Sequence, residues 1–305
     1  MSSRKMHADE ADIDVSLVHR LLGAQFPQWA DRPLTRVDSA GTSNAMYRLG
    51  ADLAVRLPRM AGAAGDVAKE HRWLPRLAPA LPTAVPTPLG KGEPAEGYPF
   101  PWSVYSWLAG ENPVAGRLAE PELLAKDLAA FVVALHGVDP TGGPPSYRSE
   151  PLLARDDATR DALGSLRGAV DADTATAMWE AALRAPERHG PAVWIHADLQ
   201  PGNLLTTDGR LGAVIDFGCL GLGDPAVDLM VAWYVLPAEG RRVFRAAVAA
   251  DDAVAADDAA WARGRGWALS VALMELRYYR DTNPRMAAIA RHVLGELLSG
   301  DGDAG

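Results

Sequence analysis

The feature that most constrains the fold of this sequence is one β-hairpin signal inside a long region with helical spacing. Residues 203–207 and 211–215 are apolar or β-branched runs, and Asp208-Gly209 lies between them. An Asp-Gly pair between two such runs is the strongest short signal for a two-residue hairpin turn. Around it, apolar residues recur three and four positions apart, which predicts helices over 121–136, 151–168, 172–189, 224–236, 238–249, 255–280 and 284–298. A single hairpin among predicted helices needs an explanation, and the polar residues at its two ends supply one.

Polar residues stand at both ends of this hairpin. Segment 196–203 (HADLQPGN) precedes it and segment 215–218 (IDFG) follows it. Because a hairpin returns the chain to its start, we expect Asp198, Asn203 and Asp216 to converge at one end of the two strands. Two carboxylates and an amide oxygen are hard ligands suited to Mg²⁺, which binds few protein groups together with substrate phosphates.

The order and spacing of these residues are those of the protein-kinase catalytic loop and its Asp-Phe-Gly metal motif. In that template Asp198 accepts the proton of the acceptor hydroxyl, and Asn203 and Asp216 hold the metal ions that bridge the nucleotide phosphates. In the alternative interpretation Asp198 is a turn residue and Asp216 a helix cap, which requires three separate elements to agree by accident.

With segment 223–229 (GDPAVDL) added, the sequence resembles the aminoglycoside phosphotransferase family, small-molecule kinases with a protein-kinase-like fold. The likeness is strong over 194–229 and extends more loosely over 30–298. It implies an α+β, two-lobed fold with an antiparallel-sheet N-terminal lobe, one main helix in that lobe, and a mostly helical C-terminal lobe. It also implies Mg²⁺, ATP or GTP as co-substrate, and a small-molecule hydroxyl as acceptor, with aminoglycosides and macrolides as the best-known acceptors.

A Pro- and Gly-rich stretch over 79–101, followed by the apolar run 102–108, predicts where the lobes meet. We expect a nucleotide-binding lobe over 1–105, a hinge over 106–110, and over 111–305 a helical lobe with the catalytic loop, the metal motif and the acceptor site. In the first lobe we expect strands over 35–49, 53–57, 87–90 and 102–108 and a helix over 64–77, which Pro75 kinks or ends.

Nucleotide-binding residues in the first lobe follow from the template with weaker signals. Segment 39–47 contains Thr42, Ser43 and Asn44, whose backbone could cradle phosphate, although a plain polar turn explains it equally well. The hinge residues Ser106 and Leu108 would face the base through backbone groups, with Tyr105 behind them.

Arg56 stands where the kinase template has the phosphate-binding Lys. Leu53, Val55 and Leu57 alternate with it and face the core, so Arg56 faces the other way. Its expected partner is Glu70 on the helix. Alternatively, Glu70 is a solvated charge paired with Lys69 or Arg72, and Arg59 contacts the phosphates if the register differs.

Three residues are predicted to support the catalytic loop. His196 has an architectural hydrogen-bonding role, and Asp224 and Asp228 accept hydrogen bonds from the loop, although Asp224 before a Pro is also a good helix N-cap. Ala197 replaces the Arg that binds a phosphorylated activation loop in protein kinases. Only four residues separate Gly218 from segment 223–229, too few for a regulated activation segment, so we expect a constitutively active enzyme.

The charge of the chain bears on its acceptor. Its net charge is −9, with 12 basic and 11 acidic side chains over 1–108 and 18 and 28 over 109–305. An acidic balance argues against nucleic acid and anionic membranes as partners. An acidic second lobe would attract a polycationic aminoglycoside, although an ordinary soluble surface explains the acids equally well.

Acceptor-lining candidates lie on the helix before Asp281, namely Trp267, Glu275, Tyr278 and Tyr279. Three tryptophans, Trp179, Trp233 and Trp267, would suit the broad apolar cleft of a macrolide kinase, but aromatic residues at helical spacing more often belong to the core. The first functional hypothesis is an aminoglycoside kinase. The others are a macrolide kinase, a metabolic kinase for a choline, homoserine or sugar-like acceptor, and a nucleotide-binding pseudokinase.

Further classes are excluded by composition. One Cys excludes a disulfide framework and a multi-Cys zinc site. The first 14 residues have no apolar stretch of a signal peptide, and no apolar run approaches the ~20 residues that span a bilayer. We therefore expect a cytoplasmic protein. The sequence carries no signal for an oligomeric state.

Overall fold

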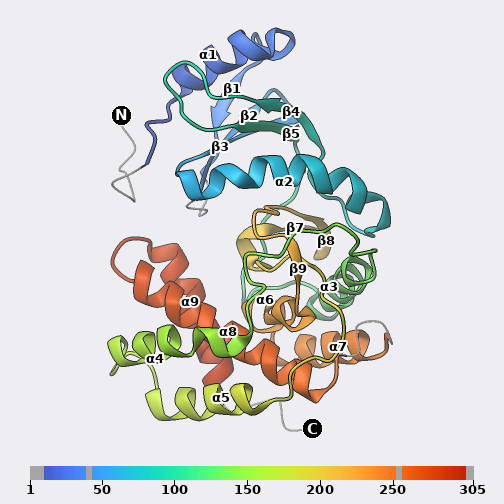
Figure 1. Ribbon diagram of the computed structural model, residues 1–305, viewed down its shortest axis with the longest axis vertical. Coiled ribbons are helices and arrows are strands. Elements are labelled where there is room, and N and C mark those ends of the chain that lie inside the picture. Colours follow the sequence, from blue (N-terminus) through green and yellow to red (C-terminus); the bar gives the residue numbers. More distant parts are fainter. Residues whose placement is uncertain (1–9, 39–42, 252–255, 300–305) are drawn as a thin grey trace. The chain divides into compact units, whose positions relative to one another are not determined.

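The computed structural model describes residues 10–38, 43–251 and 256–299, and the chain forms two compact units (Figure 1). Unit 1 consists of Met1–Pro79, Ala84–Gly110 and Ala213–Gly218, and unit 2 of Ala80–Thr83, Glu111–Gly212 and Cys219–Gly305. The predicted lobes were continuous stretches, whereas segment 213–218, which contains Asp216, belongs to unit 1. Its attachment has a visible cause, since the Val214 amide donates to the Ala84 carbonyl at 3.0 Å within that unit.

Unit 1 is built on an antiparallel five-stranded sheet with the strand order β1-β2-β3-β5-β4. Tyr47, Val55 and Val104 face one another across the three central strands. Helix α1 packs on the apolar face of this sheet and helix α2 lies along the other face (Figure 1). The elements are α1 (Val15–Gln25), β1 (Leu34–Arg36), β2 (Asn44–Leu49), β3 (Leu53–Pro58), α2 (Ala61–Leu77), β4 (Pro88–Gly92) and β5 (Trp102–Ser106).

The alternation of β3 determines which residues serve the core of unit 1. Leu53, Val55 and Leu57 are buried in the cluster that α1 covers, so Arg56 between them faces α2. Helix α2 extends past Pro75 to Leu77, which leaves that Pro in the last turn, where it interrupts little of the helix.

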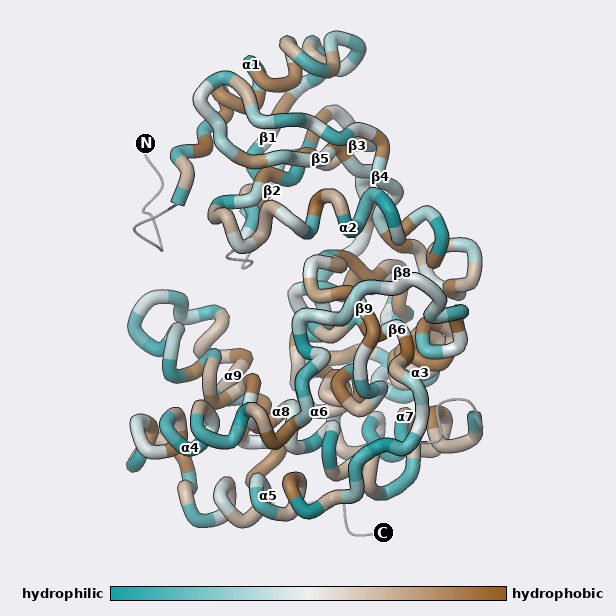
Figure 2. Tube along the Cα trace, viewed as in Figure 1, coloured by the Kyte–Doolittle hydropathy of each residue, from teal (hydrophilic) through white to brown (hydrophobic). Residues whose placement is uncertain are grey.

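Unit 2 is mostly helical. Three helices have the predicted bounds, namely α3 (Pro121–His136), α7 (Ala238–Ala249) and α9 (Pro284–Leu298). Along α3, hydrophobic residues recur between hydrophilic ones, and those at the predicted spacing are buried (Figure 2). The other helices are α4 (Asp156–Ser165), α5 (Ala172–Arg184), α6 (Val231–Val235) and α8 (Asp258–Tyr279).

Where the helices differ from prediction, the differences are at helix ends. Short 3₁₀ segments replace the first parts of two predicted helices, Leu152–Arg155 before α4 and Pro225–Met230 before α6. Helix α5 ends at Arg184, because Pro186 disfavours helical backbone in the residue before it. None of the described helices is both long and apolar enough to cross a membrane.

Two short two-stranded sheets lie near the functional motifs. The predicted hairpin is formed by β7 (Leu204–Thr207) and β8 (Arg210–Val214), and its turn residues Asp208 and Gly209 have φ values of 51° and 76°. Positive φ at both positions is what a type I′ turn requires. The second sheet pairs β6 (Val193–Ile195) with β9 (Gly221–Gly223), a strand that the sequence did not predict.

Candidate active site

In unit 1 the predicted site residues gather around one arginine. Arg56 donates to Glu70 Oε1 at 2.6 Å and to Asp216 Oδ1 at 2.7 Å. With its amide oxygen turned toward the guanidinium, Asn44 accepts from Arg56 at 2.8 and 3.0 Å. Three predicted site residues therefore surround Arg56, and we refer to Arg56, Glu70, Asp216 and Asn44 as the arginine cluster.

The arginine cluster forms because β3 and α2 direct opposite charges toward each other. Glu70 lies on the buried side of α2, 2% exposed, and its second oxygen accepts from the Tyr105 hydroxyl. Burial alone would lower the pKa of Arg56, but the carboxylates of Asp216 and Glu70 raise it well above its ordinary value. Glu70 is thus not a solvated charge, and the alternative pairing with Lys69 or Arg72 is not adopted.

Asp216 occupies a restricted backbone conformation. Its φ is 59°, and its Oδ1 accepts from the Gly218 amide at 3.4 Å. The Gly218 carbonyl accepts from Lys69, which also pairs with Asp66 at 3.2 Å. A Cβ at Gly218 would lie 3.0 Å from Asp66 Oδ2, so the close approach of α2 favours glycine there. This contact of Lys69 was not predicted.

Two other predictions for the first lobe concern the segment with Thr42 and Ser43 and the alternative phosphate ligand Arg59. Thr42 lies outside the described residues. The Ser43 carbonyl accepts from the Arg59 amide at 2.8 Å, and the Arg59 guanidinium pairs with Glu10 at 3.3 Å. Arg56 rather than Arg59 is therefore the arginine of the cluster.

The hinge residues are partly committed to the sheet of unit 1. The Ser106 amide donates to the Thr87 carbonyl at 3.0 Å, and the Trp107 amide donates to the Asp52 carbonyl at 2.7 Å. These two amides are therefore not available to a nucleotide base. If the hinge contacts the base, it does so through its other backbone groups, including those of Leu108.

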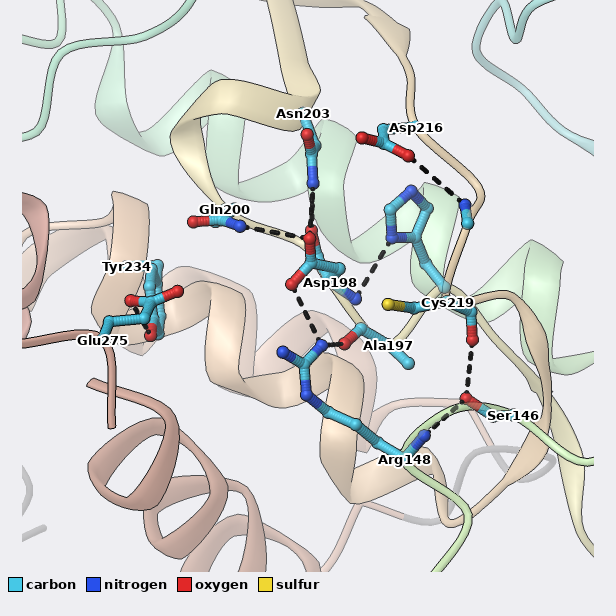
Figure 3. Close-up of polar contacts among 12 residues, drawn as sticks. Ser146, Arg148, Ala197, Asp198, Gln200, Asn203, Asp216, Cys219, Tyr234 and Glu275 are labelled. Carbon is cyan, nitrogen blue, oxygen red and sulfur yellow. Dashed lines mark hydrogen bonds and ion pairs between the residues drawn. The ribbon is translucent and has the colours of Figure 1, made fainter. Parts of the chain in front are cut away.

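In unit 2, Asp198 is held by donors on both carboxylate oxygens (Figure 3). Arg148 donates to Oδ1 at 3.0 Å, while Gln200 and Asn203 donate to Oδ2 at 3.1 and 2.9 Å. Asn203 also donates to the Asp198 carbonyl at 2.8 Å, which ties the two ends of the catalytic loop together. The Asp198 side chain remains 19% exposed.

The electrostatic surroundings of Asp198 keep it ionised. Burial raises the pKa of this carboxyl, but the positive charge of Arg148 and the hydrogen bonds from Gln200 and Arg148 outweigh burial and lower it. A carboxylate that is ionised at neutral pH and still reachable is able to accept a proton.

Asp228 supports the loop from below. It is fully buried, and it accepts from the His196 amide at 3.0 Å, the Ala197 amide at 2.7 Å and His136 Nε2 at 3.1 Å. The His196 ring accepts from the Asp198 amide at 3.3 Å. The expected contacts of Asp228 and His196 with the catalytic loop are therefore present, and His136 is an additional partner.

The expectation for Asp224 was wrong in its contacts. Asp224 caps the 3₁₀ segment Pro225–Met230 by accepting from the Ala226 amide at 3.0 Å, and it pairs with Arg263 at 2.8 Å. Asp224 is thus an N-cap, which was the alternative interpretation of the sequence. The Pro that follows it favours a helix N-terminus at that point.

The acceptor candidates on α8 separate into two kinds. Trp267 is 1% exposed and stacks with Arg155, so it belongs to the core, and the prediction that it lines the acceptor site was wrong. Tyr278, 53% exposed, contacts Tyr279 edge to face. Trp179 and Trp233 are also fully buried, so these tryptophans do not form an apolar cleft.

Glu275 has a different environment from Asp198. Its Oε2 accepts from the Tyr234 hydroxyl at 2.9 Å. Burial, with the charge of Asp198 adding to it, raises the pKa of Glu275 to about 7. Of the residues that matter most to Asp198, sequence reasoning missed Arg148 and Gln200. Gln200 stands inside the catalytic loop and was open to notice, whereas Arg148 stands in an irregular segment with no local signal.

Comparisons with known proteins identify the family of the chain and its fold. Residues 35–267 match the sequence pattern of the phosphotransferase enzyme family. A search of curated proteins finds no match. Among solved structures, the GDP complex of wild-type aminoglycoside 2'-phosphotransferase-IIIa is 20% identical with a TM-score of 0.74, over 94% of this chain and 99% of that one.

Two other solved structures widen the comparison. The gentamicin complex of APH(2")-IIa is 16% identical with a TM-score of 0.60, over 94% of this chain and 97% of that one. Macrolide 2'-phosphotransferase MphH from Brachybacterium faecium is 22% identical with a TM-score of 0.58, over 92% of this chain and 98% of that one. These likenesses show a shared α+β, kinase-like fold. Since the family pattern covers most of the sequence, the chain belongs to the phosphotransferase enzyme family.

Proposed function

We propose that this phosphotransferase moves the γ-phosphoryl group of ATP or GTP to a hydroxyl of a small molecule, with Asp198 as the general base. The observation that carries the proposal is the set of donors on Asp198. A carboxylate offers about four acceptor positions. Donors of the described residues take one position on Oδ1 and two on Oδ2, which leaves Oδ1 able to accept from an incoming hydroxyl.

In the proposed reaction the hydroxyl oxygen of the acceptor bonds to the γ-phosphorus as its proton passes to Asp198. The bond from that phosphorus to the β,γ-bridging oxygen breaks, and the nucleoside diphosphate leaves. Arg56 contributes a permanent positive charge for the phosphates, since a guanidinium binds phosphate oxygens bidentately and stays ionised. The rest of the nucleotide is proposed to be held by Thr42, Ser43 and Asn44 and by the hinge at Ser106 and Leu108.

The residues proposed as Mg²⁺ ligands, Asn203 and Asp216, fit that ion by their chemistry. Asn203 donates with its amide nitrogen to Asp198, so its amide oxygen is the atom available to a cation. The arginine cluster holds two carboxylates, Glu70 and Asp216, for one guanidinium, so it has one negative charge more than Arg56 neutralises. Bound Mg²⁺ would neutralise charge on the nucleotide phosphates.

For the acceptor, an aminoglycoside is the first candidate. The acidic excess of residues 109–305 and the carboxyl of Glu275 near Asp198 support an acceptor with amino groups. Gln200 adds a second oxygen that can accept a hydrogen bond from the substrate. Its Oε1 is buried without a hydrogen-bond partner in the part of the chain that the structure describes. Amino and hydroxyl hydrogens are the donors that these two groups would receive.

A second candidate is an acceptor with few charges, such as a macrolide or a choline, homoserine or sugar-like metabolite. The specific observation in its favour is Arg148, whose charge offsets that of Asp198 at the point where the acceptor hydroxyl must bind. Glu275 with a pKa of about 7 carries only part of a negative charge at neutral pH. A polycation therefore meets less negative charge beside Asp198 than the whole chain suggests.

The test is a coupled assay of nucleoside diphosphate release with ATP and with GTP, across aminoglycosides, macrolides and metabolic alcohols. We expect one acceptor class to stimulate turnover, with the phosphorylated acceptor identified by mass spectrometry. Stimulation by metabolic alcohols alone would reject the antibiotic hypothesis. Tight nucleotide binding without transfer to any acceptor would reject the enzyme and leave the pseudokinase.

A further inference from the structure

The guanidinium on Asp198 comes from a segment that is firmly attached to β9. Arg148 lies in the irregular chain between α3 and α4, and its neighbours pair with β9 in unit 2. The Ser146 amide donates to the Leu222 carbonyl at 2.9 Å, and the Leu222 amide donates to the Pro144 carbonyl at 2.8 Å. Ser146 Oγ donates to the Cys219 carbonyl at 2.7 Å (Figure 3).

This attachment is close enough to require glycine. A Cβ on Gly221 would lie 2.5 Å from Ser146 Cα, a separation that real Cβ atoms do not show. On its other side β9 pairs with β6, which leads directly into His196 and the catalytic loop. Strand β9 therefore joins the segment that carries Arg148 to β6, the strand that leads into the catalytic loop and Asp198.

At its tip, Arg148 bonds to two groups of the catalytic loop. Its guanidinium donates to the Ala197 carbonyl and to Asp198 Oδ1, the latter at 3.0 Å, and its side chain is only 12% exposed. Ala197 has a φ of 66°, a left-handed conformation that strains an L-residue and persists only with support from its surroundings. Its amide donates to Asp228 at 2.7 Å. An anion thus holds the amide of this left-handed residue and a cation holds its carbonyl.

We infer that Arg148 is a positioning residue for Asp198, which fixes the left-handed backbone at Ala197 and the direction of the carboxylate oxygen that receives the acceptor proton. The inference rests on the proposed role of Asp198 as the base. Ala197 has no polar side chain, so the catalytic loop supplies no cation of its own at this peptide. Arg148, which lies 49 residues earlier in the chain, supplies this cation.

The inference is tested with Arg148→Met, Arg148→Lys and the control Arg241→Met. Arg241, on α7, is another buried arginine of unit 2; it pairs with Glu296 of α9 at 2.5 Å and lies outside the proposed site. With the best acceptor, we expect Arg148→Met to lower kcat about 10²-fold, as for a misplaced catalytic group, with the nucleotide KM little changed. Arg148→Lys should recover part of kcat, since an ammonium keeps the charge without the planar fork. Arg241→Met should lose stability and keep kcat.

A kcat of Arg148→Met equal to that of the wild type would overturn the inference. Equal losses of kcat in Arg148→Met and Arg241→Met would do so too, because both would then reflect general destabilisation. Crystal structures of the wild type and of both Arg148 variants provide a readout that needs no acceptor. We expect Ala197 to leave the left-handed region, or the Asp198 carboxylate to rotate, in Arg148→Met and less so in Arg148→Lys. Unchanged Ala197 and Asp198 in Arg148→Met would refute the positioning role even if the chain proved to transfer no phosphate.

Discussion

The two units hold their central charge in opposite ways. In unit 1 a cation, Arg56, is surrounded by acceptors, with two carboxylates and an amide oxygen around one guanidinium. In unit 2 an anion, Asp198, is surrounded by donors, with one guanidinium and two amides on one carboxylate. The first group carries one net negative charge, whereas the charges of the second cancel.

This difference matches different chemical tasks. A group with unbalanced negative charge attracts a further cation, as the proposed Mg²⁺ site requires. A balanced carboxylate holds its charge at neutral pH without attracting a metal, which is what a proton acceptor needs. Each expectation below would break or sharpen this contrast.

The largest effect is expected for Asp198→Asn. The amide has nearly the shape of the carboxylate, but it cannot take a proton, and its NH₂ group would face donors of Arg148, Gln200 or Asn203. We expect kcat to fall about 10²–10⁴-fold, the usual contribution of a general base, with nucleotide affinity retained. Steady-state kinetics and calorimetric nucleotide titration measure the two quantities, and full activity would remove Asp198 from the mechanism.

Replacement of Arg56 should lower the free energy of unfolding as well as the affinity for nucleotide. In Arg56→Met, Glu70 keeps the hydrogen bond from the Tyr105 hydroxyl but loses its ion pair with Arg56, the one that the structure gives it among the described residues, and becomes a buried unpaired carboxylate. Breaking a buried ion pair in this way costs about 3–5 kcal/mol of unfolding free energy. The double variant Arg56→Met/Glu70→Gln should regain much of that loss in urea unfolding. If it does not, the lost stability arises from packing and not from the unpaired acid.

Asp216→Ala tests the net charge of the arginine cluster. Arg56 retains Glu70 and Asn44 in this variant, so we expect a folded protein. Nucleotide binding measured with Mg²⁺ should weaken about 10²-fold, which corresponds to about 2.7 kcal/mol, while binding measured with EDTA should hardly change. An unaltered Mg²⁺ dependence would show that the metal ligands lie elsewhere.

The smallest effect is expected for Glu275. The donors that lower the pKa of Asp198 leave the pKa of nearby Glu275 raised. The pKa of Glu275 is raised to about 7 from its ordinary 4.5, so the unfolded state releases this proton at lower pH than the native state. Its contribution to stability is full below about pH 4.5 and is lost as pH rises to about 7. Relative to Glu275→Gln, the wild type should therefore lose roughly 2–3 kcal/mol of unfolding free energy between about pH 5 and about pH 8. A pH-independent difference in urea unfolding would place an ionised carboxylate in that position.

Local signals in the sequence account for the parts of the fold that were predicted. The Asp208-Gly209 turn and the periodic helices 121–136, 238–249 and 284–298 depend on residues close to one another in the chain. Strand β9 has only three residues, two of them glycine, and exists because β6 and the Ser146 segment pair with it. Because β9 is stabilised by segments far away in the sequence, no local pattern predicts it.

The site divides along the same line. Asn203 and Gln200 reach Asp198 from within the same loop, while Arg148 depends on a contact across 50 residues. Helical spacing also gave no means of separating a lining residue from a core residue, and for this reason Trp267 was misplaced.

The membership of segment 213–218 in unit 1 limits how this protein can be divided. A recombinant fragment that stops at Gly110 would omit Val214, the donor to Ala84, and Asp216, one partner of Arg56. Such a fragment would contain every strand of the five-stranded sheet and still have an incomplete arginine cluster. Unit 1 expressed alone would therefore need residues 213–218 grafted back or added in trans as a peptide.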